Sequence, residues 1–501
     1  MNEFLEDLTD ATNYVRTENG ALAHKTTRKA VYDMFALGGA YRVRTDEDCI
    51  LLFKNAFEED RTLAVRCLFY LRDVRGGQGE RRFFRVCYRW LCKEYPKIAE
   101  TNMLWVSEMG RWDDLIYTAQ GTPAQNCAYR ILATQLAEDL NCKTPSLLGK
   151  WLPSENASSK KTKKAATAFR EYLKMTHKQY RKILSLLREK INIVERLMSE
   201  NRWDEIEFDK IPSKAGLIYR NAFARRDILA RKYEMFMKDK STTVNAKALF
   251  PYEIVEKVAD RYGWYHNYYR DWDESDIERL ALNKYWENLP DYLDGQPCSM
   301  MCVVDTSSSM YGRPEAVAIS LGLYCAERIG EPFKDHFISF SRNAKLIKTE
   351  GIDFVDKVRR IYSQCLCENT NIDSVFNLLK SIALHNQKAK ETMPKTIVII
   401  SDMEIDYNSS DWNQRNSESH MERIRKDWES NGLTMPHLVY WNVESRDENK
   451  FLDLGENVTL VGGCSPIIFQ SVLTGKTGYE LCLEILNGER YQYITGETYE
   501  E

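Results

Sequence analysis

Apolar, strand-like runs alternate with amphipathic, helix-like segments after about residue 291, and this alternation restricts the possible folds more than any other feature of the chain. Strands are expected at residues 299–305, 336–340, 396–402, 437–442 and 458–462, and helices at 314–329, 353–362, 373–385, 418–431 and 466–473. Strands separated by helices pair in parallel through right-handed crossovers. The pattern therefore predicts a doubly wound α/β domain with helices on both faces of its sheet.

The chain before residue 291 has a different, helical pattern. Apolar residues recur at spacings of three and four over residues 26–290, most clearly in a stripe through 180–198, and strand-like alternation is absent. Segments 62–72 and 81–94 flank a glycine-rich turn, which is typical of consecutive antiparallel helices. We predict a multidomain chain with a polar segment at 1–25, an all-α, HEAT-like domain at 26–290 and the α/β domain at 291–501.

Charge and composition favour a cytoplasmic protein with a basic middle region. Residues 51–250 carry 38 Lys and Arg against 24 Asp and Glu, although the net charge of the whole chain is −4. Such a region is typical of a domain that binds a polyanion. No apolar run is long enough for a membrane span, the first ten residues lack the apolar core of a signal peptide, and the thirteen cysteines show no paired metal spacing. We expect reduced thiols and no membrane partner.

Oxygen-bearing side chains follow two of the expected strands. Asp305, Ser307 and Ser309 come at and after the end of the first strand in the spacing D-x-S-x-S, and Asp402 ends the strand at 396–402. Thr370 lies in a loop before the helix at 373–385. Carboxylates and hydroxyls suit a hard cation, so we expect Mg²⁺, with Ca²⁺ or Mn²⁺ as alternatives. The competing interpretation is that the serines only cap a turn or a helix.

In their order and context these five residues resemble the metal-ion-dependent adhesion site of von Willebrand factor A domains. The resemblance implies that the hydroxyls bind the metal directly, that the acids act through water, and that one coordination position stays open for an acidic residue of a partner protein. Met403 and Glu404 follow Asp402 where many A domains have glycine, and a second acid, Asp406, lies two residues further on. The two acids are expected either to crowd the cation or to add ligands.

Two basic segments are candidates for RNA binding. The first, RGGQGERR, contains Arg75, Arg81 and Arg82, and its alternative role is a helix end and turn with flanking arginines. The second is a run of lysines and one arginine that continues into the next expected helix. Its members are Lys160, Lys161, Lys163, Lys164, Lys178, Arg181 and Lys182. Nearby aromatic residues favour nucleic acid, whereas the alternative is a solvated helix face.

Segments along nearly the whole chain resemble the DUF2828 family. They are TENGALAHKT (17–26), FALGGAYR (35–42), DVRGGQGERRFF (73–84), GRWDDL (110–115), KWLPSEN (150–156), MSENRWDEIEFDKIPSKA (198–215), VVDTSSSM (303–310), NTN (369–371), SDMEID (401–406) and YWN (440–442). The layout also resembles that of the TROVE-type Ro autoantigen proteins. That resemblance implies a helical domain that holds the single-stranded end of structured or misfolded RNA, with small noncoding RNAs on an outer basic surface.

The sequence favours a scaffold over an enzyme. There is no H-E-x-x-H motif and no nucleophile elbow around Ser307 or Ser309, and Cys464 has no identifiable base nearby. The first hypothesis is a ribonucleoprotein component whose helical domain binds RNA and whose A domain binds a partner through the metal. The second is an adaptor that uses the metal site to bind protein and never binds RNA.

Overall fold

A computed structural model describes residues 12–191, 193–261, 276–295, 298–365, 368–406 and 420–498. It divides into two compact units, each built from separate stretches of the chain. Residues 1–44 and 246–485 form the first, called here the α/β unit, and residues 45–245 and 486–501 form the second, called here the helical unit. Each unit thus combines stretches that are far apart in the sequence. The domain boundaries expected at residues 25 and 290 remain predictions.

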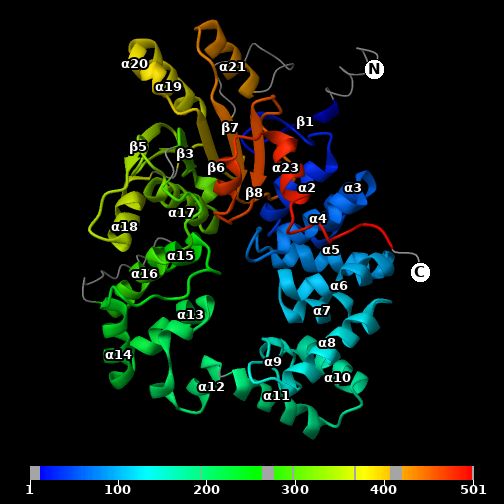
Figure 1. Ribbon diagram of the computed structural model, residues 1–501. Helices are drawn as coiled ribbons and strands as arrows, with labels where there is room; N and C mark the ends of the chain where they lie inside the picture. Colours follow the sequence, from blue (N-terminus) through cyan, green and yellow to red (C-terminus); the bar gives the residue numbers. More distant parts are fainter. Residues whose placement is uncertain are drawn as a thin grey trace. The chain divides into compact units, whose positions relative to one another are not determined.

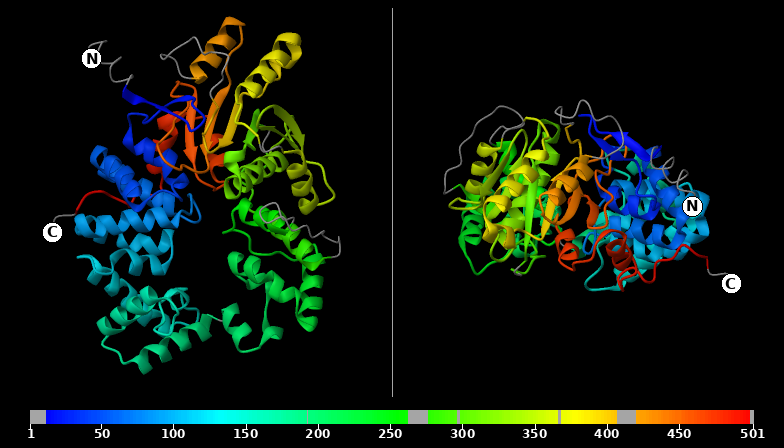
Figure 2. Two further views of the ribbon diagram at one scale, coloured as in Figure 1. Left: turned by 180° about the vertical axis from the view of Figure 1, so that it is seen from behind. Right: turned by 90° about the horizontal axis from the view of Figure 1, so that it is seen from above.

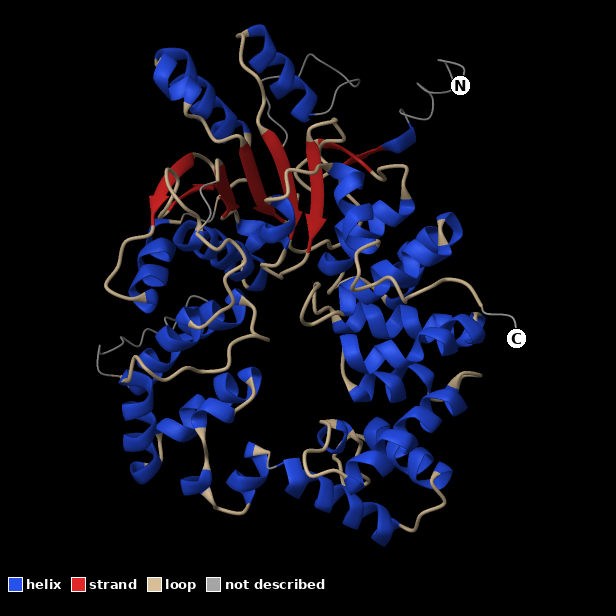
Figure 3. Ribbon diagram, viewed as in Figure 1, coloured by secondary structure: helices blue, strands red, loops and turns tan. Residues whose placement is uncertain are grey.

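The α/β unit contains a six-stranded sheet with the order β5-β4-β3-β6-β7-β8 (Figure 3). Its strands are β3 (Met300–Asp305), β4 (His336–Phe340), β5 (Ala344–Lys348), β6 (Thr396–Ser401), β7 (His437–Asn442) and β8 (Val458–Gly462). All neighbours pair in parallel except the edge strand β5, which is antiparallel to β4. This is the doubly wound order in which the first strand lies in the centre. The predicted α/β fold is confirmed.

Burial on both faces explains why the central strands are continuously apolar. Every residue of β3 is buried, as is every residue of β6 after Thr396. The crossover from β3 leads to β4 on one side, whereas the crossover from β6 leads to β7 on the other. Since both are right-handed, their helices cover opposite faces.

The helices of the α/β unit come from both stretches of the chain (Figure 1). They are α2 (Ala30–Leu37), η1 (Gly38–Ala40), α15 (Pro251–Arg261), α16 (Ile277–Glu287), η4 (Ser308–Met310), α17 (Arg313–Arg328), α18 (Phe354–Gln364), α19 (Asp373–His385), α20 (Gln387–Glu391), α21 (His420–Ser430), α22 (Ile468–Val472) and α23 (Gly478–Leu486). Helix α15 packs against α17, and α16 packs against α18 (Figure 2). The expected helix at 418–431 begins at residues outside the described part.

Helix α2 covers the edge strand β8. The backbone N–H of Leu460 donates a 2.8 Å hydrogen bond to the Tyr32 hydroxyl, so this edge group is paired. A side chain at Gly462 would place its Cβ 2.1 Å from the Ala36 carbonyl oxygen. The close approach of α2 to β8 therefore requires glycine at this position.

A short N-terminal hairpin also belongs to the α/β unit. It pairs β1 (Tyr14–Arg16) with β2 (Leu22–His24) in antiparallel register. The hairpin, the strand β5 and the helices α20 and α23 were not predicted. Short strands of mixed polarity do not show the alternation by which strands are recognised in a sequence.

The helical unit contains only helices and loops among its described residues. Its helices are α3 (Asp46–Glu59), α4 (Arg61–Arg72), α5 (Arg81–Glu94), α6 (Pro96–Met109), α7 (Trp112–Ala119), α8 (Gln125–Asn141), α9 (Leu148–Trp151), α10 (Lys160–Tyr172), α11 (His177–Ile191), α12 (Val194–Ser199), η2 (Trp203–Glu205), η3 (Phe208–Lys210), α13 (Ser213–Ala224) and α14 (Asp227–Lys238). Consecutive helices from α3 to α8 pack on one another. The predicted helical stack is confirmed, but the stripe at 180–198 is divided between α11 and α12.

Residues 486–498 pack onto the helices of the same unit. Asp73, which is fully buried, accepts hydrogen bonds from the Arg490 guanidinium and from the Tyr491 hydroxyl, the latter at 3.0 Å. Asn102 Nδ2 donates to the Thr495 carbonyl at 2.7 Å.

In the described part of the chain, no helix combines the length and apolar composition needed to cross a bilayer.

Candidate metal centre

The predicted metal ligands lie at the carboxyl ends of neighbouring strands in the α/β unit. Asp305 is the last residue of β3, and Asp402 directly follows β6, its parallel neighbour. The chain leaves these two strands in opposite directions, which opens a crevice at this edge of the sheet. Open α/β sheets bind their ligands in this position.

Asp305 is held by two hydrogen bonds. Its Oδ1 accepts from the backbone N–H of Ser307 at 2.9 Å, and its Oδ2 accepts from the Ser401 hydroxyl at 2.5 Å. The same Ser401 oxygen accepts from the Met403 backbone at 2.9 Å. The carboxylate is fully buried, and these bonds fix its orientation.

The two predicted serine ligands point toward one another. Ser307 Oγ and Ser309 Oγ lie 3.1 Å apart, on the turn and the 3₁₀ helix η4 that follow β3. The backbone N–H of Ser308 donates to the Glu368 carbonyl at 3.0 Å. This bond joins the serine loop to the segment that carries Thr370, which is itself buried.

Asp402 has the unsatisfied oxygen expected of a cation ligand. Its Oδ1 accepts from the Glu404 backbone at 3.2 Å, whereas its buried Oδ2 accepts no hydrogen bond from the residues that the structure describes. Burial raises the pKa of Asp402, and burial together with the negative charge of Asp402 raises the pKa of Asp305. A divalent cation relieves both effects, so these residues fit such an ion.

The acids that follow Asp402 already accept hydrogen bonds from other groups. Asp406 Oδ2 accepts from the backbone N–H of Thr370 at 2.8 Å, and its own N–H donates to the Thr370 carbonyl at 3.0 Å. Glu404 accepts from the Lys450 ammonium and, at 2.6 Å, from the Glu18 backbone. Neither carboxylate is hydrogen-bonded to Asp305. Their engagement with other groups favours a cation site with few charged ligands.

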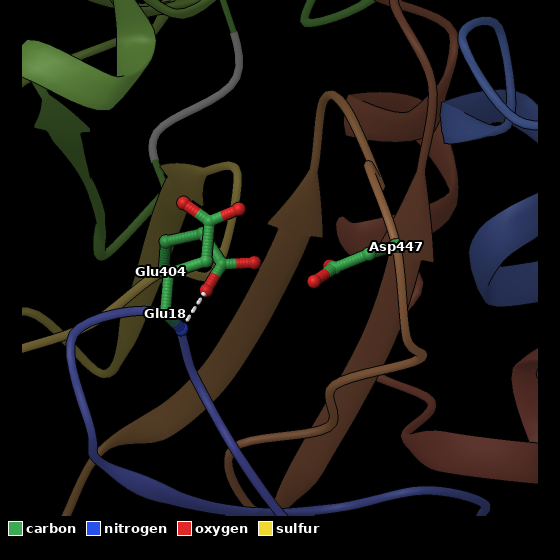
Figure 4. A group of neighbouring side chains, drawn as sticks. All are labelled: Glu18, Glu404 and Asp447. Carbon is green, nitrogen blue, oxygen red and sulfur yellow. Dashed lines mark hydrogen bonds between the residues drawn. The ribbon is translucent and has the colours of Figure 1, made fainter.

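Glu18, Glu404 and Asp447 form a second group of carboxylates (Figure 4). The Lys450 ammonium donates to Glu404 and, at 2.9 Å, to Asp447. A single lysine charge therefore offsets part of the charge of these three acids. Two of the three acids, Glu18 and Asp447, are exposed, whereas Asp305 and Asp402 are both buried.

Three residues at the centre were missed in the sequence. Ser401 donates to Asp305, Asn19 Nδ2 approaches Thr370 Oγ1 at 3.5 Å, and Arg446 Nη2 lies 3.3 Å from Asp402 Oδ2. Asn19 comes from the N-terminal hairpin and Arg446 from the loop after β7, so their positions depend on tertiary structure. Only Ser401, next to an expected ligand at a strand end, could have been inferred from its place in the sequence.

The arginines of the first basic segment lie in the helical unit, and two of the three form ion pairs. Arg75 pairs with Glu108 at 3.1 Å, and Arg82 pairs with Asp46 at 2.5 Å. Arg81 is exposed. A Cβ at Gly77 would lie 1.9 Å from the Tyr70 carbonyl oxygen, so the glycine-rich turn has a packing reason of its own.

The lysine run meets an arginine of α5 at Tyr117 of α7. Lys161 Nζ lies 5.4 Å and Arg85 Cζ 4.7 Å from the centre of its ring, and the Tyr117 and Thr162 hydroxyl oxygens are 3.4 Å apart. Lys161 of α10 and Arg85 of α5 thus lie near the same ring of α7, and Arg85 is also paired with Asp113 and Asp114. The other members of the lysine run are also exposed, on α10 or α11: Lys160, Lys163, Lys164, Lys178, Arg181 and Lys182.

Two family models match nearly the whole chain. The domain of unknown function DUF2828 matches residues 17–117 and 145–296, which is just over half of the chain, and the domain of unknown function DUF7788 matches residues 299–488. The chain belongs to the DUF2828 family. The predicted family membership is confirmed.

One protein and one solved structure are similar to this DUF2828 protein. Uncharacterized protein L728 of Acanthamoeba polyphaga mimivirus is 29% identical over 483 residues, which cover 88% of this chain and 81% of the relative. The crystal structure of the Deinococcus radiodurans RO (RSR) protein aligns with a TM-score of 0.45 and 12% identity over 93% of this chain and 100% of that one.

The structure gives physical roles to two segments of the DUF2828 resemblance. In GRWDDL, Asp114 forms a buried ion pair with Arg72 at 2.7 Å and a second pair with Arg85 at 2.6 Å. In FALGGAYR, a Cβ at Gly39 would lie 2.7 Å from the Gly462 carbonyl oxygen. Both segments therefore stabilise packing inside their own unit.

Proposed function

We propose that this DUF2828 protein is a non-enzymatic scaffold. Its α/β unit binds a divalent cation, and through that cation an acidic group of a partner protein, while its helical unit binds RNA. The observation that carries the proposal is the pair of buried acids, Asp305 and Asp402, one of which has an oxygen without a hydrogen-bond partner among the described residues. Such a pair is costly without a nearby positive charge.

The residues of the centre have separable roles in this proposal. Ser307, Ser309 and Thr370 offer neutral oxygens, while Asp305 and Asp402 provide the negative charge. A bound Mg²⁺ would supply an electrophilic centre that attracts an external carboxylate. Because Lys450 and the Thr370 backbone bind Glu404 and Asp406, these acids leave the cation under-neutralised.

The RNA role is supported by the exposed lysines and arginine of the run on α10 and α11. Lys160, Lys163 and Lys164 are exposed in the first turns of α10, where the positive end of the helix dipole disfavours further cations. Their mutual repulsion is relieved by an anion. The spacing of phosphates along a nucleic acid suits such a run of charges.

Cation binding is tested by titrating the metal-free protein with Mn²⁺ and counting bound ions by electron paramagnetic resonance. One site of micromolar to millimolar affinity, competed by Mg²⁺ and lost in Asp305→Ala, is expected. Matching Mn²⁺ affinities in the wild type and this variant would refute the site.

A protein adaptor that does not bind RNA is the alternative function. The two are distinguished by the 260 to 280 nm absorbance ratio of the purified protein and by anisotropy of a fluorescent uridine oligonucleotide. Co-purifying nucleic acid and an affinity that falls steeply with salt support the scaffold with RNA. Clean protein that leaves the oligonucleotide free at low salt supports the adaptor.

A further inference from the structure

The guanidinium of Arg446 contacts two of the five predicted metal-binding residues. Its Nη2 donates to the backbone carbonyl of Ser309 and lies 3.3 Å from Asp402 Oδ2. The Asp402 side chain is fully buried, whereas that of Arg446 is 30% exposed. Arg446 therefore reaches from the surface onto the oxygen that lacks a hydrogen bond from the described residues.

The backbone around Arg446 is fixed by its neighbours. Ser445, which is buried, donates its N–H to the Ala40 carbonyl at 3.0 Å, and Glu444 donates its N–H to Asn442 Oδ1 at 3.0 Å. The Glu444 carboxylate accepts from Arg446 Nε at 3.4 Å. These contacts hold the loop after β7 in place, while the Arg446 side chain is partly exposed to solvent.

The contact with Asp402 is electrostatic. The pair lies within ion-pair distance, but Asp402 Oδ2 receives no hydrogen bond in the described part of the chain. An ion pair without a hydrogen bond is more easily exchanged for another cation than a bidentate one. A divalent ion at the centre needs the same carboxylate, and it repels a guanidinium placed this close.

We propose that Arg446 is a built-in counter-ion that competes with the divalent cation for Asp402. In the metal-free protein its guanidinium offsets the buried carboxylate, and cation binding displaces it toward solvent. The inference rests on the proposed cation site. Its consequence is that Arg446 lowers the affinity of the site, so that the site fills only when the cation concentration is high enough to exchange the arginine.

The experiment compares Mn²⁺ binding to the wild type, Arg446→Gln and Arg342→Gln. Arg342 is an exposed arginine in the loop after β4, and its guanidinium makes no ion pair with described residues. It controls for the loss of one positive charge near the sheet edge. Arg446→Gln is expected to tighten Mn²⁺ binding on the order of tenfold, in the range of coupled binding equilibria. Arg342→Gln should change it much less, because solvent screens exposed charges.

Thermal unfolding separates competition from a purely structural role. In the presence of a chelator, Arg446→Gln is expected to melt below the wild type, and saturating Mn²⁺ should raise its melting temperature more than it raises that of the wild type. A lower melting temperature with unchanged or weaker Mn²⁺ binding would show that Arg446 only supports the fold, and would overturn the proposal.

Mn²⁺ binding also distinguishes an incorrect cation site from an incorrect role for Arg446. If neither protein binds Mn²⁺, both proposals fall, whereas binding by Arg446→Gln alone supports the competition. If the wild type binds and Arg446→Gln binds no more tightly, only the competition is refuted. Should Arg446→Gln not fold, a crystal of the wild type soaked in Mn²⁺ decides, because a guanidinium still in contact with Asp402 beside the bound ion contradicts displacement.

Discussion

The Ser401 hydroxyl donates a 2.5 Å hydrogen bond to Asp305 across two neighbouring parallel strands, β6 and β3. The bond connects the strand ends that carry the two buried acids of the candidate metal centre. It also leaves Asp402, the next residue after Ser401, directed at the same crevice. The position of the acid pair thus follows from strand pairing, which the strand sequences themselves specify.

Asp305→Ala should abolish cation binding. The substitution removes a charge that the neutral hydroxyls of Ser307 and Ser309 cannot replace, so we expect Mn²⁺ affinity to fall by more than about 100-fold. Isothermal titration calorimetry measures the loss. Ser308→Ala, which removes an exposed hydroxyl from the same turn, is the matched control and should bind Mn²⁺ normally. An equal loss in both variants would show that the turn, and not the carboxylate, matters.

Asp373→Asn should destabilise the α/β unit in a pH-dependent way. Burial alone raises the pKa of Asp373, yet hydrogen bonds and charges from His420 and Arg423 lower it from 3.8 to about 2. The carboxylate therefore stabilises the fold above about pH 4, and this contribution disappears as the pH falls toward 2. At pH 7 the variant should lose about 2 kcal/mol of unfolding free energy.

Urea unfolding at a series of pH values measures this effect. The difference between wild type and Asp373→Asn should shrink on acidification, and Glu429→Gln, an exposed acid on α21, should show almost no difference at any pH. A difference that stays constant from pH 7 to acid would assign the effect of Asp373→Asn to packing instead of charge.

Reversing the lysine run should weaken RNA binding and flatten its salt dependence. Glutamate at Lys160, Lys161, Lys163 and Lys164 would remove the four proposed phosphate contacts, which would reduce the slope of log affinity against log salt. Anisotropy of a labelled uridine oligonucleotide over a salt series provides the slope. Four dispersed, exposed lysines changed to glutamate are the control, namely Lys54, Lys93, Lys143 and Lys240. Equal effects of both sets would indicate a general charge effect.

Tyr491→Phe should destabilise the helical unit. The substitution removes the hydroxyl that donates to buried Asp73, and a lost hydrogen bond to a charged group costs about 1.5–3 kcal/mol. Guanidinium unfolding measures the change. Tyr493, which is 66% exposed and stacks on Trp105, gives the control Tyr493→Phe with an expected change below about 0.5 kcal/mol. Unchanged stability in Tyr491→Phe would mean that Arg490 alone satisfies Asp73.

The strands that carry the candidate centre were predictable because they are buried on both faces. Short, continuous apolar runs such as 300–304 and 397–400 do not show the pattern of an amphipathic helix. The bounds of β4, β7 and β8 agree with those expected. Strand β5 was missed because its residues are mostly polar or exposed at the sheet edge. Edge strands carry less of the apolar pattern by which strands are recognised.

The five predicted metal-binding residues were recognisable because each lies at or near the end of an expected element. Arg446 and Asn19 were not, because nothing in their local sequence indicates a role. Ser445, the residue before Arg446, is bonded to Ala40, more than 400 residues earlier in the chain. Contacts over such sequence separations are set by the assembled fold and have no periodic pattern.

The pairing of Leu460 with Tyr32 has a consequence for work with truncated proteins. A fragment made by cutting the chain where the α/β pattern begins, near residue 291, keeps all strands of the six-stranded sheet but loses α2, α15 and α16. Its outermost strand, β8, would then present bare backbone groups to solvent, an arrangement that promotes strand-to-strand aggregation. Insoluble expression of that fragment would reflect an uncovered edge and would say nothing about the fold of the intact chain.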